Sequence, residues 1–327
     1  MNRRYLLALA AVMLAPLVAL PFLSSAQSQY PDRSIRLIVP FAPGGVVDVV
    51  ARLWAEQVKG ALGTVVVENH AGGGGVIGAG EVARAQPDGY TILLGNTSTQ
   101  VLNPAIMANP PYDPAKAFQT VSILANSAVS IAVNPNVPAK TLAELTAHIK
   151  ANPGKLSYGS PGAGTFTHLA GEMYKQLANT PDLTHIPYRG AGPGISDLVS
   201  GHIPVMFLNI TNQVIELHKS GTIRIVAVLT PKRLDVLPDV PTGSETLPNL
   251  VAMLFTGLFV PAGTPAAVID RIAQANRAAM NNAEYKAKLV GAGMDPVSDI
   301  PAEAQRFVDA ERDRLVPLVK STGFKPG

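Results

Sequence analysis

The stretch that decides the fold is SIRLIVPFAPGGVVDVVARLWAEQV, residues 34–58. It begins with an apolar run at 35–39 that a proline ends, and from residue 46 onward apolar residues recur at helical spacing. This pattern predicts a buried strand, a turn at Gly44 and Gly45, and an amphipathic helix. The first N–H groups of a helix have no intrahelical partner, and the helix dipole adds about half a positive charge there. The turn is therefore predicted to hold an anion such as a carboxylate, which glycine allows to approach the backbone closely.

A second stretch has the same order of features. Residues 156–158 are predicted to form a short strand, residues 159–164 a glycine-rich turn, and the residues that follow an amphipathic helix. Thr165 is a candidate N-cap for that helix, and Ser160 or Thr167 could take the same role. Two such turns, one in each half of the chain, could hold a small anion from opposite sides. This is the central hypothesis that the sequence suggests.

Residues 1–26 are predicted to be a secretory signal and not part of the fold. A short basic start is followed by an apolar run at 5–20, and small residues precede Gln27, so cleavage is expected near Ala26. The alternative, a membrane anchor, is disfavoured because the apolar run falls short of the ~20 residues that a span needs. The chain has no cysteine, which excludes a disulfide and a lipid attached at cysteine. We expect an exported protein in the periplasm of a bacterium with two membranes.

Composition argues against several classes of protein. With 47% hydrophobic and 15% charged residues among 327, the chain is expected to fold into globular domains with proper cores. The formal net charge of +3 falls to +1 when Arg3 and Arg4 leave with the signal. No run of lysine or arginine offers a clustered basic face, so no nucleic-acid partner is expected.

The glycine run at 72–75 contains part of a nucleotide-binding pattern. Gly73, Gly75 and Gly78 have the spacing of a dinucleotide fingerprint. That fingerprint also needs an acidic residue about twenty positions further on, and the chain has an asparagine, a threonine and a serine at 96–98. We interpret these glycines as a tight connection between a strand and a helix, and we expect no cofactor.

The order of predicted elements indicates an α/β fold with two lobes. Strands and helices alternate up to about residue 125, which predicts a mostly parallel sheet covered on both faces. Residues 123–133 are extended without helical period and could cross to a second lobe at 126–229. The chain would then return, so that 27–125 and 230–327 form the first lobe. Two crossings form a hinge, which is a common device for closing around a ligand.

Several motifs that occur in order along the mature chain resemble one protein family. The motifs are Pro40-Phe41-Ala42-Pro43-Gly44-Gly45-x-x-Asp48, Val67-Glu68-Asn69, Pro87-Asp88-Gly89-Tyr90-Thr91, Tyr158-Gly159-Ser160-x-Gly162-x-Gly164-Thr165-x-x-His168, His185-Ile186-Pro187-Tyr188-Arg189-Gly190 and Leu237-Pro238-Asp239-Val240-Pro241-Thr242. Together they resemble the periplasmic Bug-type receptors of tripartite tricarboxylate transporters. The resemblance covers essentially the whole mature chain, and it is the joint pattern that is specific.

The resemblance implies a type II periplasmic-binding-protein-like fold, of the flytrap kind, without catalysis or cofactor. Members of the family hold small carboxylates between the lobes and deliver them to a two-component membrane permease. Carried over by position, Pro43, Gly44 and Gly45 would make the first-lobe contact, and Asp48 would read the distal part of the ligand. The second-lobe contacts would come from four further residues, Ser160, Gly162, Gly164 and Thr165.

The apolar pair at 46–47 stands where relatives often carry a small polar residue. This difference leaves room for a monocarboxylate or an aromatic acid beside dicarboxylates. A monomer is the default for a receptor that must diffuse.

Other candidates come from positions at strand ends and helix starts. Asn96 and Ser98 follow a predicted strand at the edge where ligands of parallel sheets bind, and Asn209 follows another. Asp48 could contact the ligand or only stabilise its helix. The remaining candidates at the proposed cleft are Phe41, Tyr188, Arg189, which could equally be a solvated surface charge, and His168, which could instead pack against neighbouring backbone.

Two other functions are less consistent with the sequence. A hydrolase triad with Ser160 and His168 lacks the Gly-x-Ser-x-Gly elbow, and a proline follows the serine. The six histidines show no close ligand spacing, so no metal is expected. A receptor that signals to a sensor kinase would have the same lobes, so the sequence leaves that alternative open.

Overall fold

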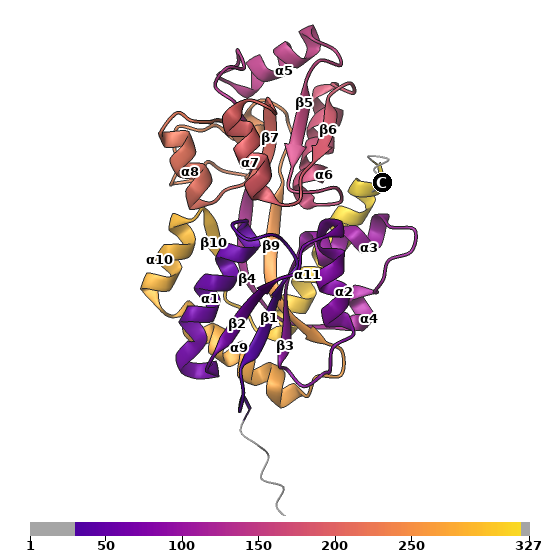
Figure 1. The fold of residues 1–327 in the computed structure, drawn as a ribbon, viewed down its shortest axis with the longest axis vertical. Helices are drawn as coiled ribbons and strands as arrows, with labels where there is room; N and C mark the ends of the chain where they lie inside the picture. The colour runs from indigo at the N-terminus through magenta and orange to yellow at the C-terminus, as the bar shows by residue number, and fades with distance from the viewer. Residues whose placement is uncertain (1–29, 322–327) are drawn as a thin grey trace, which may run out of the picture.

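The structure is a computed structural model that describes residues 30–321. The predicted signal segment, 1–26, and its cleavage point near Ala26 lie outside the described residues. The described chain forms two α/β lobes stacked along the long axis of the molecule (Figure 1). The predicted two-lobed α/β fold is confirmed.

The first lobe is built on three parallel strands and three that run antiparallel to their neighbours. Strands β1 (Ile35–Val39), β2 (Val65–Asn69) and β3 (Thr91–Asn96) are parallel, in the order β2-β1-β3. Beside β3 lies β9 (Met253–Pro261), followed by the first half of β4 (Phe118–Val133), and β10 (Met294–Pro296) pairs with β4. The sheet is therefore parallel on its outer side only, and antiparallel around β4 and β9.

The helices of this lobe cover its sheet. They are α1 (Val46–Leu62), α2 (Val76–Ala83), α3 (Asn103–Ile106), α4 (Pro114–Ala117), α9 (Ala266–Met280), α10 (Ala283–Gly291) and α11 (Pro301–Ser321), with single turns at η1 (Gly73–Gly75) and η2 (Ser98–Leu102). Helix α1 buries Val50, Trp54 and Val58, which recur at the predicted spacing. The indole N–H of Trp54 donates to Asn276 of α9 at 3.1 Å, which ties the first helix to the tail of the chain.

The second lobe repeats the arrangement on a smaller scale. Strands β5 (Ser157–Ser160), β6 (Thr184–Pro187) and β7 (Val205–Asn209) are parallel in the order β7-β5-β6, and the second half of β4 pairs antiparallel with β7 and with β8 (Arg224–Val228). The helices are α5 (Leu142–Ala151), α6 (Phe166–Ala178), α7 (Ala191–Ser200) and α8 (Asn212–Lys219), with a short turn η3 (Gly243–Glu245) in the return segment.

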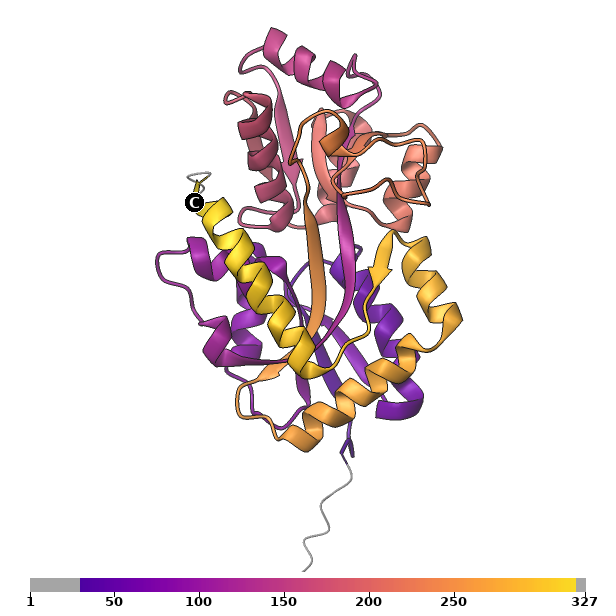
Figure 2. The same ribbon diagram turned by 180° about the vertical axis from the view of Figure 1, so that it is seen from behind.

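Strand β4 belongs to both sheets and forms one of the connections between the lobes. Figure 2 shows β4 and β9 running side by side between the lobes. Leu229 donates its N–H to Val129 of β4 at 2.7 Å, and Ala252 donates to Leu229 at the same distance. Leu237 and Val240 pack with the apolar cluster of the second lobe. The predicted boundaries at 126 and 230 remain a prediction.

Most elements were predicted close to where they lie. The sequence predicts a helix over 142–151 and a strand over 184–187, and α5 and β6 have these bounds. The short helices α3, α4 and α8 and the strand β10 were not predicted. Within residues 30–321, no helix combines the length and the apolar character that crossing a bilayer requires.

Candidate functional site

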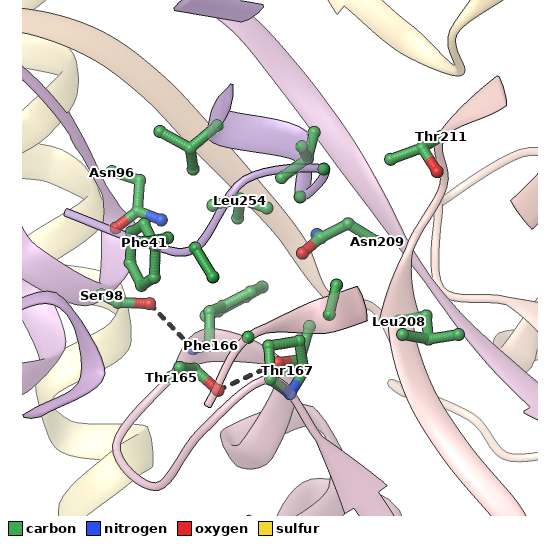
Figure 3. A pocket seen from close by; sticks show the side chains of 18 of the residues that line it. Phe41, Asn96, Ser98, Thr165, Phe166, Thr167, Leu208, Asn209, Thr211 and Leu254 are labelled. Carbon is green, nitrogen blue, oxygen red and sulfur yellow. Dashed lines mark hydrogen bonds between the residues drawn. The ribbon is translucent and has the colours of Figure 1, made fainter. Parts of the chain in front are cut away.

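A pocket lies between the two lobes, with a cavity volume of about 50 Å³. The first lobe contributes residues from 41–47 and 96–98, the second from 161–167, 190–195 and 208–214, and Leu254 of β9 completes the lining (Figure 3). The two glycine turns of the central hypothesis thus face one pocket from opposite lobes.

Four helices of the two lobes begin at this pocket. Their N-cap residues, Gly45 for α1, Thr165 for α6, Gly190 for α7 and Thr211 for α8, all line it. Each helix start carries about half a positive charge and N–H groups without an intrahelical acceptor. Among the described residues, none of the lining side chains is charged, so the attraction for an anion comes from the helix starts and from neutral polar groups.

Two asparagines at the ends of strands add side-chain donors. In Figure 3, Asn96 of β3 and Asn209 of β7 lie on opposite sides of Leu254. The amide oxygen of Asn96 accepts from the N–H of Thr99 at 3.2 Å. The amide nitrogen of Asn209 is buried and has no hydrogen-bond partner among the described residues. A buried donor without an acceptor is costly, so a ligand acceptor at this atom would be favoured.

The rest of the lining is largely apolar. Large apolar side chains come from both lobes: Phe41, Val46, Val47, Phe166, Ile195, Leu208, Val214 and Leu254. Such a surface stabilises a hydrocarbon body and disfavours a charge that finds no donor. The pocket therefore combines polar helix starts with an apolar wall.

The first-lobe turn is held by the carboxylate of Asp48. Its two oxygens accept from the N–H of Gly44 at 3.0 Å, from the amide of Asn69 at 3.0 Å, and from two guanidinium nitrogens of Arg52 at 2.9 and 3.0 Å. Burial opposes ionisation of this carboxyl, but the bonds from Arg52, Gly44 and Asn69 outweigh it and lower its pKa. Asp48 is 4% exposed and does not line the pocket, so its carboxylate acts on the turn.

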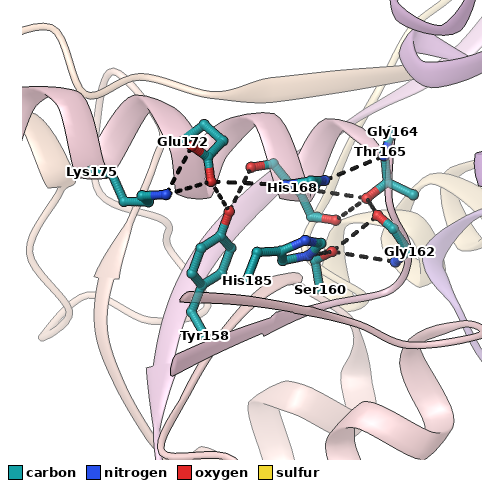
Figure 4. Close-up of polar contacts among 10 residues, drawn as sticks. Tyr158, Ser160, Gly162, Gly164, Thr165, His168, Glu172, Lys175 and His185 are labelled. Carbon is teal, nitrogen blue, oxygen red and sulfur yellow. Dashed lines mark hydrogen bonds and ion pairs between the residues drawn. The ribbon is translucent and has the colours of Figure 1, made fainter. Parts of the chain in front are cut away.

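The second-lobe turn is held by uncharged groups (Figure 4). The hydroxyl of Thr165 donates to the carbonyl of Gly162 at 2.7 Å and accepts from the N–H of His168. The N–H of Gly164 donates to Nδ1 of His168 at 3.3 Å, and the hydroxyl of Ser160 lies 2.8 Å from Nε2 of His185. The turn between β5 and α6 is thus fixed from behind by two histidines and a serine.

The two histidines stack on each other inside the second lobe. The ring centroids of His168 and His185 are 3.4 Å apart, and Glu172 lies 3.8 Å from Nε2 of His168. Glu172 also accepts from the hydroxyl of Tyr158 at 2.7 Å and pairs with Lys175. Burial lowers the pKa of His168 to about 3, with His185 and Lys175 adding to the effect, and burial with Lys175 lowers the pKa of His185 to about 4.

The structure brings seven of the predicted site residues to the pocket. These are Phe41, Gly44, Gly45, Asn96, Ser98, Thr165 and Asn209. Their contacts with a ligand remain a prediction. Gly44 already donates its N–H to Asp48, and the hydroxyl oxygen of Ser98 accepts from the N–H of Phe166 in the opposite lobe at 2.9 Å.

The other predicted residues lie elsewhere. Pro43 is exposed, and Asp48, Ser160 and His168 lie behind the turns, where they hold the backbone. Gly164 belongs to the second-lobe turn itself, where a Cβ atom would lie 2.9 Å from the amide oxygen of Asn103 in the first lobe. Gly162 and Tyr188 line an adjoining groove together with Arg189, and the Tyr188 hydroxyl donates to Asp197 at 2.8 Å. The same signals that pointed to Thr165 and Asn209 could have found Thr167, in the first turn of α6, and Thr211, the N-cap after β7.

A hydrolase or metal site does not fit this geometry. Ser160 is fully buried and pairs with His185, not His168, and it does not reach the pocket. Among the described residues, no three metal-ligating side chains form a cluster.

Comparison with known proteins shows the family. Residues 50–324 match the model of the tripartite tricarboxylate transporter family receptor. The chain belongs to this receptor family. Its members are solute-binding receptors, so the prediction that the chain is not an enzyme is confirmed, and family membership implies the periplasm. The predicted resemblance is confirmed as well.

Three solved structures show the same architecture as this receptor. The periplasmic binding protein BugD is 33% identical, with a TM-score of 0.86 over 90% of this chain and 99% of that chain. Rpa4515 of R. palustris, solved with adipate, is 30% identical, with a TM-score of 0.87 over 91% and 100%. MatC of Rhodopseudomonas palustris, solved with bound malate, is 29% identical, with a TM-score of 0.83 over 89% and 100%.

Proposed function

We propose that this receptor captures a small carboxylate between its lobes and delivers it to a two-component membrane permease. The observation that carries the proposal is the buried amide nitrogen of Asn209, which has no partner among the described residues and lines a pocket where four helices begin. A carboxylate supplies the acceptor that this donor lacks and the negative charge that the helix starts attract.

The comparisons support a carboxylate as the class of ligand. Two relatives of similar fold are described with adipate and with malate. The apolar wall of this pocket is compatible with aliphatic and aromatic bodies, so we extend the proposed class to mono-, di- and aromatic carboxylates. Delivery to a permease is supported by the family of transporter receptors to which the chain belongs.

Binding and closure are proposed as one event. The hydrogen bond between Ser98 and Phe166 joins the lobes directly beside the pocket. A ligand that contacts both lobes favours the state in which these groups meet, because it makes its full set of contacts only there. A monomer would suffice for this mechanism.

A thermal-shift screen tests the proposal. The panel would contain acetate, succinate, malate, adipate, benzoate and nicotinate, each beside its neutral amide. We expect at least one acid, and no amide, to stabilise the protein saturably, by about 2.7 kcal/mol at a hundredfold excess over Kd. Stabilisation by the amides to the same degree would argue against a site for carboxylates.

A substitution connects any shift to the pocket. Asn209→Ala removes the unpaired donor, and we expect Kd for the best acid to rise by roughly 10- to 100-fold, the usual worth of a hydrogen bond to a charged group. Asn212→Ala is the matched control, because Asn212 is exposed on the first turn of α8 and does not line the pocket. Equal affinities of the two variants would contradict the assigned role of Asn209.

A further inference from the structure

The glycine run at 72–75 is not explained by ligand contact, since none of its residues lines the pocket between the lobes. Gly72, Gly73, Gly74 and Gly75 all have positive φ, at 142°, 56°, 64° and 100°. Four consecutive residues in this region are readily formed only by glycine. The run ends where α2 begins, and it lines the groove that adjoins the pocket.

The second-lobe turn lies directly on this run. A Cβ atom built at Gly74 would be 2.7 Å from the carbonyl oxygen of Ala163, which belongs to the turn between β5 and α6. The distance is shorter than any real Cβ contact with an oxygen, and the obstacle is backbone, which cannot rotate away. The main chain of one lobe therefore meets the main chain of the other at Gly74.

Asn103 connects the two sides of this contact. Its amide nitrogen donates to the carbonyl of Gly74 at 2.9 Å, within the first lobe. Its amide oxygen faces the second lobe, because a Cβ built at Gly164 would lie 2.9 Å from it. Asn103 is 2% exposed in this arrangement. The carbonyl of Gly74 is thus fixed in place opposite Ala163.

A second close approach lies on the other side of the groove. A Cβ built at Gly190, the N-cap of α7, would lie 2.6 Å from the Cβ of Ala42 in the first-lobe turn. The two contacts, at Gly74 and Gly190, border the same groove next to the pocket. Missing side chains on both lobes therefore allow the lobes to approach to backbone distance.

We infer that the second-lobe turn between β5 and α6 packs against the glycine run when the lobes close, and that Gly74 is a positioning residue for ligand retention. The inference rests on the proposed function, since it concerns closure over the same pocket. Gly74 contacts no ligand in this mechanism. Its missing side chain leaves room for Ala163, and only then can the helix starts of both lobes surround the anion together.

The test compares two glycines that differ in one respect. Gly73 and Gly74 are neighbours with similar positive φ, so alanine strains the backbone at both. A Cβ at Gly73 would meet only the Cβ of Val76, at 3.6 Å and within the first lobe. Gly74→Ala is expected to weaken binding of the best acid roughly tenfold or more relative to Gly73→Ala, because only Gly74→Ala obstructs the opposite lobe.

The kinetics distinguish a role in closure from general damage. An obstructed closed state still admits the ligand, so we expect Gly74→Ala to raise the dissociation rate with little change in the association rate. The melting temperatures of the two ligand-free variants are expected to agree. Equal dissociation rates for the two variants would overturn the inference.

A second pair of variants avoids the strain of alanine. Asparagine tolerates left-handed backbone better than other residues, so Gly73→Asn and Gly74→Asn isolate the effect of the added side chain. The same difference in dissociation rate is expected between them. If both asparagine variants retain the ligand as the wild type does, Gly74 does not set the closed position.

A distance measurement observes closure itself. The chain has no cysteine, so Lys59→Cys and Lys150→Cys, both at exposed positions on different lobes, can carry a pair of spin labels without further changes. We expect the best acid to shift this distance in the Gly73→Ala background and not in the Gly74→Ala background. If the wild type binds no acid, the proposed function fails; if it binds and both backgrounds shift alike, only the inference about Gly74 fails.

Discussion

The two turns that face the pocket have the same plan and are held in different ways. Each follows a strand and precedes a helix, at Gly45 in the first lobe and at Thr165 in the second. Gly45 has no side chain to cap its helix, and the turn is held by the ionised carboxylate of Asp48. Thr165 caps its own helix, and neutral histidines hold the turn from behind.

Because groups with different pKa values hold the two turns, acidification is expected to destabilise them at different pH. The pKa of Asp48 is lowered from 3.8, so its contribution to stability is present above that value and is lost only below it. The pKa of His168 is lowered from 6.5 to about 3, so the unfolded state gains protons first and stability is lost as pH falls below 6.5. As the pH falls, the second turn should therefore lose stability at a higher pH than the first turn.

The largest effect is expected from breaking the charged turn. Asp48→Ala leaves the N–H of Gly44 and the side chains of Arg52 and Asn69 without their acceptor. We expect a loss of about 3 kcal/mol in the free energy of unfolding, measured by chemical denaturation. The control Glu56→Ala removes an exposed carboxylate from the same helix and should change stability by less than about 0.5 kcal/mol. Equal losses would mean that the carboxylate does not hold the turn.

A smaller effect is expected from acid at the neutral turn. Between pH 7 and pH 5 the folded protein should lose about 2 kcal/mol through His168, because the unfolded state takes up a proton that the folded state excludes. His168→Gln keeps an acceptor for the N–H of Gly164 and cannot titrate, so its denaturation curves should depend less on pH. His202→Gln, at an exposed histidine, should keep the profile of the wild type. If the stability of His168→Gln depends on pH as strongly as that of the wild type, this account is contradicted.

The smallest expected effect distinguishes the role of Thr165 as a helix N-cap from its role in ligand binding. Thr165→Ala and Thr141→Ala each remove an N-cap hydroxyl, from α6 and from α5, and each should cost about 1 kcal/mol of stability. Only Thr165 lines the pocket, so only its variant should also weaken binding of the best acid, measured by titration calorimetry. The same affinity in both variants would place the ligand away from the second turn.

The sequence predicted the elements whose signals are local. Helix α5 begins at the N-cap Thr141 and has regular apolar spacing, so its bounds could be predicted. Strand β10 has three residues and exists because it pairs with β4, more than 160 positions away. Helix α8 is a polar eight-residue segment whose two buried residues, Val214 and Ile215, give too weak a period.

The candidate site shows the same limit. The turns at Gly45 and Thr165 could be located because strand, glycine and helix follow one another in the chain. The partners of Asp48 could not, because Asn69 reaches its carboxylate from 21 positions further along, at the end of β2. The pairing of Ser160 with His185 likewise depends on the parallel register of β5 and β6.

Within residues 30–321, the pocket lining contains no charged side chain, and this has a consequence for ligand exchange. A lysine or arginine in an emptied site can turn to a neighbouring acid, and that pairing must be broken before the next anion is admitted. Peptide groups at the start of a helix cannot turn away and carry no proton that could be lost. The vacated pocket therefore keeps its electrostatic character, and successive anions meet the same field as long as the two turns stay folded.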